Sequence, residues 1–379
     1  MRKKIALIGS TGSIGRQIIN VVNRYPERFE IVAIAANTGG ELFQRQMAEQ
    51  KPAFAALRAE GETPQGISAN TRFARGEGAF EEACAYSSAD VVFVAVTGFA
   101  GLKAALCAIG AKKDIALANK ECLVAGGNLV MPAAEAAGVR VLPVDSEHSA
   151  LWQCLSFDRN APFSKLILTA SGGALRDVPL EKLPDMTAKD ALAHPNWDMG
   201  AKITVDCATM LNKGFEVIEA MHLYNAPLEK IEVVMHRESI VHSMVAFEDG
   251  AVLAQMSYPS MELPIQLALT YPERLRANAA PLDFAKLSAL HFSAPDPVRY
   301  PCFTLALECA KQGGDMPCAL NAAGEVAVQA FLRGQIKYTQ IAEIIERTLE
   351  RTVRRNAESY ALLEETDGAA RALARSLLP

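Results

Sequence analysis

Residues 4–15 read Lys4-Ile5-Ala6-Leu7-Ile8-Gly9-Ser10-Thr11-Gly12-Ser13-Ile14-Gly15, an apolar run that ends in a glycine-rich turn. The run predicts a buried β-strand, and the residues from Arg16 to Tyr25 predict a helix. Glycines let a backbone approach a pyrophosphate closely, and the first turn of a helix offers it N–H groups. The glycine spacing is GxxGxxG rather than GxGxxG, and a plain tight turn is the alternative. The position directly after a first strand favours dinucleotide binding.

The first half of the chain alternates apolar strand patterns with helical patterns. Strands are expected at residues 4–8, 31–35, 54–57, 91–94, 114–117 and 140–144, with helices such as 16–25, 40–50 and 101–109 between them. Apolar strands that alternate with helices are typical of a parallel sheet covered on both faces. The expected fold class is therefore α/β, with an N-terminal Rossmann-like doubly wound sheet.

A different pattern begins at residue 165. A strand at 165–170 is followed by a long stretch punctuated by Pro, Asp and Gly, and such long loops are often lids. A helix near 208–221 and strands at 231–235, 243–247 and 252–256 predict an antiparallel or mixed sheet. We therefore expect a central α+β domain.

The last hundred residues read as a linker and a helical bundle. Four prolines fall between residues 278 and 301, which marks a linker. Helices are expected at 303–311, 319–333, 339–355 and 360–378. The expected boundaries are 1–146 for the nucleotide-binding domain, 147–280 for the central domain with its lid at about 171–201, 281–300 for the linker, and 301–379 for the C-terminal helical domain.

Composition and charge argue against several classes of function. The chain has 379 residues, half of them apolar, and a formal net charge of −5. That balance gives no electrostatic footprint for nucleic acid or an anionic membrane, and no apolar run approaches the roughly 20 residues that span a bilayer. The eight cysteines form no CxxC pair, which predicts reduced thiols in a cytoplasmic protein.

Two carboxylates follow the strand expected at 140–144. Asp145 and Glu147 are two residues apart, so in an extended chain they would point to one side, with Ser146 on the other. Ligands of open α/β sheets bind beyond the carboxyl ends of the strands, and paired carboxylates suit a hard cation such as Mg²⁺ or Mn²⁺. The residues alone leave an equal alternative, in which Asp145 or Ser146 simply caps the next helix.

A third carboxylate lies near an amide and an ammonium group. Asn212, Lys213 and Glu216 fit within one helical turn, and Asn212 and Glu216 share a face at i, i+4. Taken alone, the pattern favours an ordinary surface pair between Lys213 and Glu216.

The end of the second strand bears on the choice of nucleotide. NAD sites usually place an acid there to hold the ribose 2′-hydroxyl, but this chain has Ala36-Asn37-Thr38. No carboxylate would repel a 2′-phosphate, which favours NADP.

Several motifs together resemble the 1-deoxy-D-xylulose 5-phosphate reductoisomerase family over essentially the whole chain. They are Gly-Ser-Thr-Gly-Ser-Ile-Gly at 9–15, Ala-Asn-Lys-Glu at 118–121, Val-Asp-Ser-Glu-His at 144–148, Ser-Gly-Gly at 171–173, His-Pro-Asn-Trp-Asp-Met-Gly at 194–200 and Asn-Lys-Gly-Phe-Glu at 212–216. The resemblance implies an NADPH domain, a central catalytic domain with a lid, a C-terminal helical domain and a homodimer built through the central sheet.

The resemblance also implies roles for individual residues. The cofactor would contact Thr11, Gly12, Ser13, Ile14, Asn37, Asn119, Glu121 and Gly200. The metal, which is Mg²⁺, Mn²⁺ or Co²⁺, would bind Asp145, Glu147 and Glu216. The sugar phosphate would contact Lys120, Ser146, Glu147, Ser171, His194, Cys207, Asn212, Lys213 and Glu216. Catalysis would involve Lys120, Glu147, His194 and Lys213, and Trp197 and Met199 would belong to the lid.

The implied activity is an NADPH- and metal-dependent rearrangement and reduction. It converts 1-deoxy-D-xylulose 5-phosphate to 2-C-methyl-D-erythritol 4-phosphate in non-mevalonate isoprenoid precursor biosynthesis, by either α-ketol migration or retro-aldol and aldol steps. A metal-free dehydrogenase and a non-catalytic NADP sensor are the rival hypotheses. Four departures from the family pattern stand out: Cys207 replaces a phosphate-binding serine, Arg237-Glu238 replaces Pro-Gln, Asn37-Thr38-Gly39 replaces a Gly-Lys-Asn-like turn, and Gly324 stands where Asn is usual.

Overall fold

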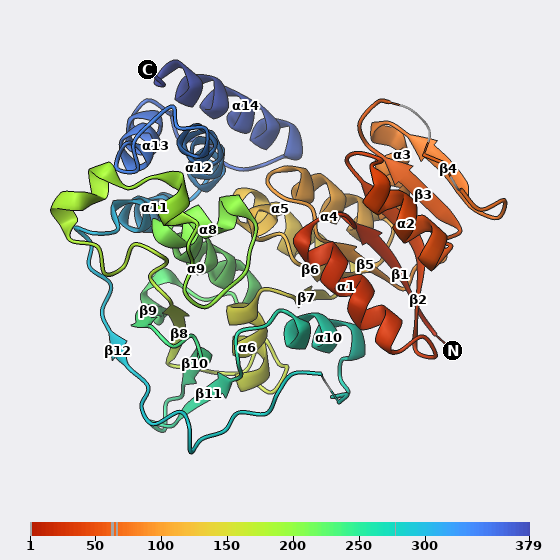
Figure 1. Cartoon of the computed structure of the whole chain (residues 1–379), viewed down its shortest axis with the longest axis horizontal. Coiled ribbons are helices and arrows are strands. Elements are labelled where there is room, and N and C mark those ends of the chain that lie inside the picture. Colours follow the sequence, from red (N-terminus) through yellow and green to blue (C-terminus); the bar gives the residue numbers. More distant parts are fainter. Residues whose placement is uncertain (1, 62–63, 66, 277) are drawn as a thin grey trace. The chain divides into compact units, whose positions relative to one another are not determined.

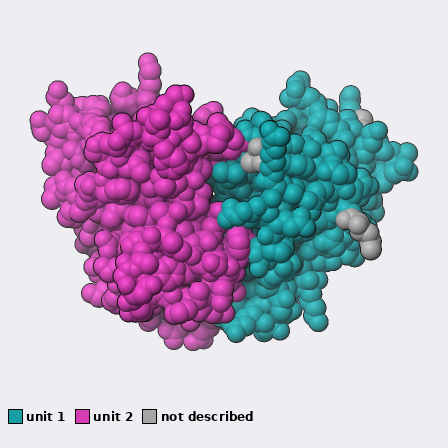
Figure 2. Space-filling view, turned by 90° about the horizontal axis from the view of Figure 1, so that it is seen from below, with its two compact units in different colours: residues 1–122, 130–145, 261–278 teal, residues 123–129, 146–260, 279–379 magenta. Residues whose placement is uncertain are grey.

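The structure is a computed structural model that describes residues 2–61, 64–65, 67–276 and 278–379. The chain forms two compact units, coloured separately in Figure 2. Unit 1 comprises residues 1–122, 130–145 and 261–278, and unit 2 comprises residues 123–129, 146–260 and 279–379. The three-domain division expected from the sequence stays a proposal, and the segment 261–278, expected in the central domain, clusters with unit 1 instead.

Unit 1 is built on a parallel sheet that has seven strands among the described residues (Figure 1). The spatial order is β4-β3-β2-β1-β5-β6-β7. The strands are β1 Lys3–Ile8, β2 Phe29–Ala36, β3 Phe54–Leu57, β4 Arg72–Arg75, β5 Val91–Val94, β6 Asp114–Leu117 and β7 Val141–Pro143. The order reverses between β1 and β5, and such a switch point is where open α/β sheets bind ligands. The predicted doubly wound parallel sheet is confirmed.

The helices of unit 1 are α1 Ser13–Arg24, α2 Glu41–Gln50, α3 Glu77–Cys84, α4 Ala100–Gly110, α5 Lys120–Ala137 and α10 Glu262–Thr270. Helix α5 also runs through residues 123–129, which belong to unit 2. Helix α10 packs against α1, where Arg24 pairs with Glu262. Beyond the helix, Arg28 Nη2 lies 2.6 Å from Glu273 Oε2. These contacts explain why the segment 261–278 joins unit 1.

Unit 2 contains a mixed sheet with the order β11-β10-β8-β9-β12 in the described chain. The strands are β8 Lys165–Ala170, β9 Ile231–His236, β10 Val241–Ala246, β11 Val252–Met256 and β12 Phe292–Ser293. The β8–β9 pair is parallel, and the other pairs are antiparallel. Helix α6, Ser146–Cys154, packs on β10 and β11. The predicted mixed sheet is confirmed.

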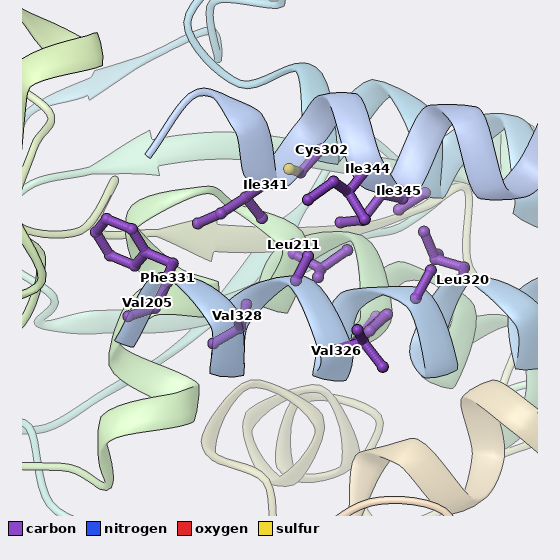
Figure 3. Packing of buried hydrophobic residues seen from close by; sticks show 14 of the residues in the cluster. Val205, Leu211, Cys302, Leu320, Val326, Val328, Phe331, Ile341, Ile344 and Ile345 are labelled. Carbon is purple, nitrogen blue, oxygen red and sulfur yellow. The ribbon is translucent and has the colours of Figure 1, made fainter. Parts of the chain in front are cut away.

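The helices that follow in unit 2 share one apolar core. They are α7 Ala188–Ala191, α8 Ala201–Ala208, α9 Leu211–Leu223, α11 Pro301–Gln312, α12 Met316–Leu332, α13 Gln340–Glu350 and α14 Tyr360–Ser376, with short 3₁₀ turns at Leu180–Asp185 and Leu228–Lys230. Side chains such as Val205, Leu211, Cys302, Leu320 and Ile345 gather in this core (Figure 3). A fully buried side chain of this size contributes about 1.5–3 kcal/mol. The core therefore ties α8 and α9, which carry predicted site residues, to the C-terminal helices.

The helix expected near 208–221 corresponds to α9, and the helix before it, α8, was not predicted. They are separated at Met210, whose φ of 56° lies in the left-handed region. The hydroxyl of Thr209 accepts a hydrogen bond from the N–H of Leu211 at 3.3 Å, which satisfies a donor at the new helix start. A non-glycine residue with positive φ carries no mark in the hydrophobic pattern, so the break could not be predicted.

Candidate active site

The three predicted metal carboxylates come together in the structure. Asp145 follows β7, Glu147 lies in the first turn of α6, and Glu216 lies on α9. Each can offer one oxygen, and these oxygens lie within 4.8 Å of one another. The strand ends at Pro143 and the helix begins at Ser146, so the expected alternation along an extended strand was wrong. The carboxylates therefore converge across the start of α6 rather than along one face of a strand.

Two lysines and an amide surround these carboxylates. Lys120 Nζ donates to Asp145 Oδ2 at 2.7 Å, and Lys213 Nζ lies 3.4 Å from Glu147 Oε1 and pairs with Glu216. Asn212 Nδ2 donates to Glu216 Oε1 at 2.5 Å. The surface-pair interpretation of Lys213 and Glu216 is wrong, because their exposed fractions are 4% and 1%. Buried carboxylates need compensating positive charge, and oxygen donors at this spacing fit a divalent cation.

A buried imidazole connects the two helices that carry Glu147 and Glu216. His148 Nε2 donates to the backbone oxygen of Glu216 at 2.9 Å, which places the ring hydrogen on Nε2. His148 Nδ1 faces Glu219 Oε2 at 3.5 Å. The hydroxyl of Tyr224 donates to the backbone oxygen of His148 at the other side. These contacts fix α6 against α9 and so set the spacing of the two carboxylates.

The Ser-Gly-Gly turn after β8 packs on helix α8. Gly172 and Gly173 have φ values of 79° and 68°, and the N–H of Gly173 donates to Ser171 Oγ at 3.2 Å. A Cβ atom at Gly173 would lie 2.5 Å from Cα of Ala208 and 2.7 Å from the backbone oxygen of Cys207. The turn can adopt this position only with glycine there. It places Ser171 beside the end of the helix that carries the half-buried Cys207.

His194 faces Ser171 in a defined tautomer. Its Nδ1 atom accepts hydrogen bonds from the N–H groups of Asn196 at 3.2 Å and Trp197 at 3.0 Å. The hydrogen therefore sits on Nε2, which lies 3.0 Å from Ser171 Oγ. Burial, with the positive charge of Arg176 as a second cause, lowers the pKa of His194 to about 4. The imidazole is thus a neutral donor near pH 7.

The predicted nucleotide turn packs closely on the backbone at two of its glycines and leads into a helix start. A Cβ atom at Gly9 would lie 2.5 Å from the backbone oxygen of Ala95, and one at Gly15 would lie 2.3 Å from that of Gly9. Helix α1 begins at Ser13 with Gly12 as its N-cap, and no side chain of a described residue caps it. Its first N–H groups, beside the partly exposed Thr11, Ser13 and Ile14, therefore fit an anion.

The other predicted cofactor residues differ in what they can offer. Asn119 is buried, and its amide caps α5 through the N–H of Cys122 while donating to Gly98 O and Glu121 Oε2. Both of its side-chain N–H donors and one acceptor position of its oxygen are thus used inside the fold. Asn37 is exposed one residue after β2. Gly200 is the exposed N-cap of α8 in unit 2.

Comparison with known proteins decides the family. A family model described as 1-deoxy-D-xylulose 5-phosphate reductoisomerase matches residues 5–127, and models of the C-terminal domains of the same enzyme match residues 141–224 and 256–373. A curated relative of that name from Geobacillus kaustophilus is 50% identical over 99% of this chain and 100% of its own length. The chain belongs to the 1-deoxy-D-xylulose 5-phosphate reductoisomerase family.

Other members of this reductoisomerase family agree over the whole length. The Synechocystis relative is 44% identical over 95% of this chain and 93% of its own. The structure of the Zymomonas mobilis enzyme in complex with NADPH has a TM-score of 0.91, with 38% identity over 100% of this chain and 99% of that one. A reductoisomerase structure with NADPH, fosmidomycin and magnesium has a TM-score of 0.92, with 36% identity over 99% and 98%. The predicted reductoisomerase activity and fold are thereby confirmed at the level of the family.

One residue close to this site was not predicted from the sequence. Arg176 lies five residues after Ser171 and donates from Nη1 to the backbone oxygen of Ser171 at 2.8 Å. No spacing rule would have selected it, because the contact depends on the two glycines that fold the turn back on itself.

Proposed function

We propose that this chain converts 1-deoxy-D-xylulose 5-phosphate to 2-C-methyl-D-erythritol 4-phosphate with NADPH and a divalent metal. The observation that carries the proposal is the convergence of Asp145, Glu147 and Glu216 beside the buried Lys213. A metal-free dehydrogenase would not need three carboxylates there. The test is NADPH oxidation with 1-deoxy-D-xylulose 5-phosphate, with and without EDTA. Turnover that survives complete chelation would contradict the metal-dependent reaction.

The carboxylate cluster supports Mg²⁺ or Mn²⁺ as the bound ion, with Co²⁺ as a further possibility to test. Asp145, Glu147 and Glu216 would hold the ion through hard oxygen donors. When bound, the ion supplies Lewis acidity toward the substrate's carbonyl and an adjacent hydroxyl oxygen. Asn212 orients Glu216, and Lys120 and Lys213 hold positive charge beside the carboxylates. Both ammonium groups would stabilise negative charge that develops on the substrate.

The phosphate of the substrate is assigned to the Ser171 turn and its neighbours. Ser171 offers its O–H as a donor, because its Oγ already accepts the N–H of the neutral His194, and Asn212 and Lys213 lie on α9. Cys207 lies at the end of α8, next to the same turn. The expected result of Ser171→Ala is a higher KM for the sugar phosphate, with NADPH affinity unchanged.

The turn at 9–15 and the neutral segment 36–38 support NADPH as the cofactor. Thr11, Gly12, Ser13 and Ile14 would hold the pyrophosphate, and Asn37 would lie near the 2′-phosphate. The proposed contacts of Asn119, Glu121 and Gly200 complete the set. Because Asn119 uses its amide within the fold, its contribution would come from its backbone or from the shape of the turn. NADPH should have a higher kcat/KM than NADH.

The segment 186–200 is proposed to close over the substrate. It has only one short helix, α7, and it carries the half-buried Trp197 and Met199. Closure of such a segment excludes water and completes the substrate contacts.

The assembly is proposed to be a homodimer joined through the sheet of unit 2. Strand β11 is an edge of that sheet, and its Val252 and Leu253 are 51% and 50% exposed. Exposed apolar edges are unfavourable in a monomer. Light scattering should give twice the chain mass, and Leu253→Lys should shift the protein toward the monomer.

Within the described residues, no helix is long and apolar enough to cross a bilayer. A cytoplasmic location is our proposal, and it rests on the eight free cysteines, which suit a reducing compartment.

A further inference from the structure

Ser171 and His194 belong to a closed ring of hydrogen bonds in unit 2. Arg176 Nη1 donates to Ser171 O at 2.8 Å and to Arg237 O at 3.1 Å. Asn196 Nδ2 donates to the same Arg237 oxygen at 2.7 Å. The backbone N–H of Asn196 donates to His194 Nδ1, and His194 Nε2 donates to Ser171 Oγ, which closes the ring. Five residues from three segments thus form one continuous circuit.

Arg176 is the member that contributes a charged side chain to this circuit. Its side chain is 14% exposed, and its Cβ would lie 3.1 Å from a Cβ atom added at Gly172. The turn at Ser171 and the β9–β10 turn at Arg237 each give it one backbone carbonyl. A guanidinium is planar and rigid, so two carbonyl acceptors fix its orientation and the spacing of the two turns.

Asn196 is the matching member on the side of the proposed lid. Its amide donates to Arg237 O and, at 2.9 Å, to Ser239 Oγ, so the loop is attached to the β9–β10 turn at two points. Its backbone N–H holds His194 in the tautomer that donates from Nε2. Asn196 therefore attaches the loop through its side chain and helps to orient the imidazole through its backbone N–H.

We propose that Arg176 and Asn196 are positioning residues, which hold Ser171 and His194 in the arrangement that receives the phosphate of the substrate. This inference rests on the proposed function, which assigns the phosphate to Ser171 and His194. The pair then presents the O–H of Ser171 toward an anion, because the His194 N–H is donated to Ser171 Oγ and the acceptor nitrogen of His194 is occupied by two backbone N–H groups. Pre-oriented donors cost less ordering on binding than mobile ones, so loss of the ring should weaken substrate binding.

The chain offers a matched control, because a second arginine holds backbone carbonyls of the segment that carries Arg176. Arg299 Nη1 also bridges two carbonyls, Leu175 O at 3.1 Å and Val178 O at 2.8 Å, but it touches no member of the ring. Arg299→Met therefore removes the same kind of contact from the same segment. Its KM shows how much a general loosening of the segment after Ser171 affects substrate binding.

The experiment compares Arg176→Met, Asn196→Leu, their double variant and Arg299→Met in the full chain with metal and NADPH. Each ring variant should raise KM for 1-deoxy-D-xylulose 5-phosphate at least about fivefold and change kcat less than threefold. The double variant should resemble the worse single variant, because both break the same circuit. The ¹⁵N chemical shifts of the His194 ring should move away from those of the pure Nε2–H tautomer in Arg176→Met and in Asn196→Leu. Arg299→Met should change neither KM nor these chemical shifts.

Distinct outcomes separate this inference from the proposed function. If Ser171→Ala leaves KM unchanged, the phosphate assignment itself is wrong. If Ser171→Ala raises KM while both ring variants match the wild type, the positioning role is wrong and the phosphate site stands. Equal KM increases in the ring variants and in Arg299→Met would also overturn it. Should Arg176→Met fail to fold by circular dichroism, Asn196→Leu tests the same circuit from its other side.

Discussion

The Nε2 atom of His194 lies 3.0 Å from the Oγ of Ser171, while its Nδ1 accepts two backbone N–H groups. The histidine is thereby committed to donating toward the serine. A proton added at Nδ1 would displace both backbone donors and would place a second positive charge near Arg176. Geometry and charge thus favour the same neutral state.

This neutral state predicts how stability depends on pH. The pKa of His194 is about 4 in the folded chain, lowered by burial and then by Arg176, against about 6.5 for an ordinary histidine. The unfolded chain therefore binds the proton more readily, and the stability that neutral His194 provides is complete above pH 6.5 and falls as the pH drops toward 4. Urea unfolding of wild type and His194→Gln, measured between pH 7 and pH 4.5, checks this. The gap between the two proteins should narrow with acid, and a widening gap would contradict the argument.

If the carboxylate cluster binds the metal and not the cofactor, changes to it should reduce turnover without weakening NADPH binding. Asp145→Asn or Glu216→Gln should lose most turnover, because a neutral amide binds Mg²⁺ more weakly than a carboxylate. Affinity for NADPH, followed by the fluorescence of the nicotinamide, should stay within about twofold of wild type. Asp114→Asn, which changes a half-buried carboxylate paired with Arg140 at the start of β6, is the control. Full activity of either cluster variant at limiting Mg²⁺ would remove the metal assignment.

The carboxylates could be predicted from the sequence because they are close together in it or lie on one helical turn. Asp145 and Glu147 are separated by a single residue, and Asn212, Lys213 and Glu216 share the first turns of α9. The role of Arg176 could not be predicted in this way. Its partners are the backbone oxygens of Ser171 and of Arg237, which is 61 residues away, and a backbone oxygen has no sequence signature.

The elements of the fold also divide into those that nearby residues predict and those that depend on contacts between residues distant in the sequence. The apolar strands β1 and β5 were predictable because they are buried on both faces of a parallel sheet. Strand β4 was missed because its residues Arg72–Arg75 lie at the sheet edge and are partly exposed. Helix α10 joins unit 1 through contacts with α1, which lies more than 230 residues earlier in the chain.

The proposed lid predicts a change in tryptophan environment. Trp197 is half-buried, with its ring 6.1 Å from that of His242, and Trp152 is the only other tryptophan. In Trp152→Phe, Trp197 becomes the sole reporter, although loss of the Trp152 hydrogen bond to Phe157 O should lower Tm slightly. Saturating phosphonate analogue with metal and NADPH should protect Trp197 from acrylamide quenching. Unchanged emission and quenching would show that the segment 186–200 does not close.

Cys207 gives the prediction that is most specific to this chain, because the family pattern has a phosphate-binding serine there. A hydroxyl is a stronger donor than a thiol, and a neutral hydrogen bond contributes about 0.5–1.5 kcal/mol. If the side chain at this position reaches the phosphate, Cys207→Ser should lower KM about two- to tenfold. Cys107 is also a half-buried thiol, but it belongs to unit 1, so Cys107→Ser controls for the general effect of replacing a thiol by a hydroxyl.

The structure supports a competing outcome for the same variant, and the two are separable. Helix α8 packs so closely on Gly173 that Cys207 could serve as a small apolar contact while Ser171 and backbone N–H groups carry the phosphate. Serine would then place a more polar hydroxyl in a contact that suits a thiol, which should lower Tm. Steady-state KM and a melting curve on Cys207→Ser distinguish these cases. A lower KM with an unchanged Tm supports direct contact with the phosphate, whereas an unchanged KM with a lower Tm assigns Cys207 to packing and leaves the phosphate to the Ser171 turn.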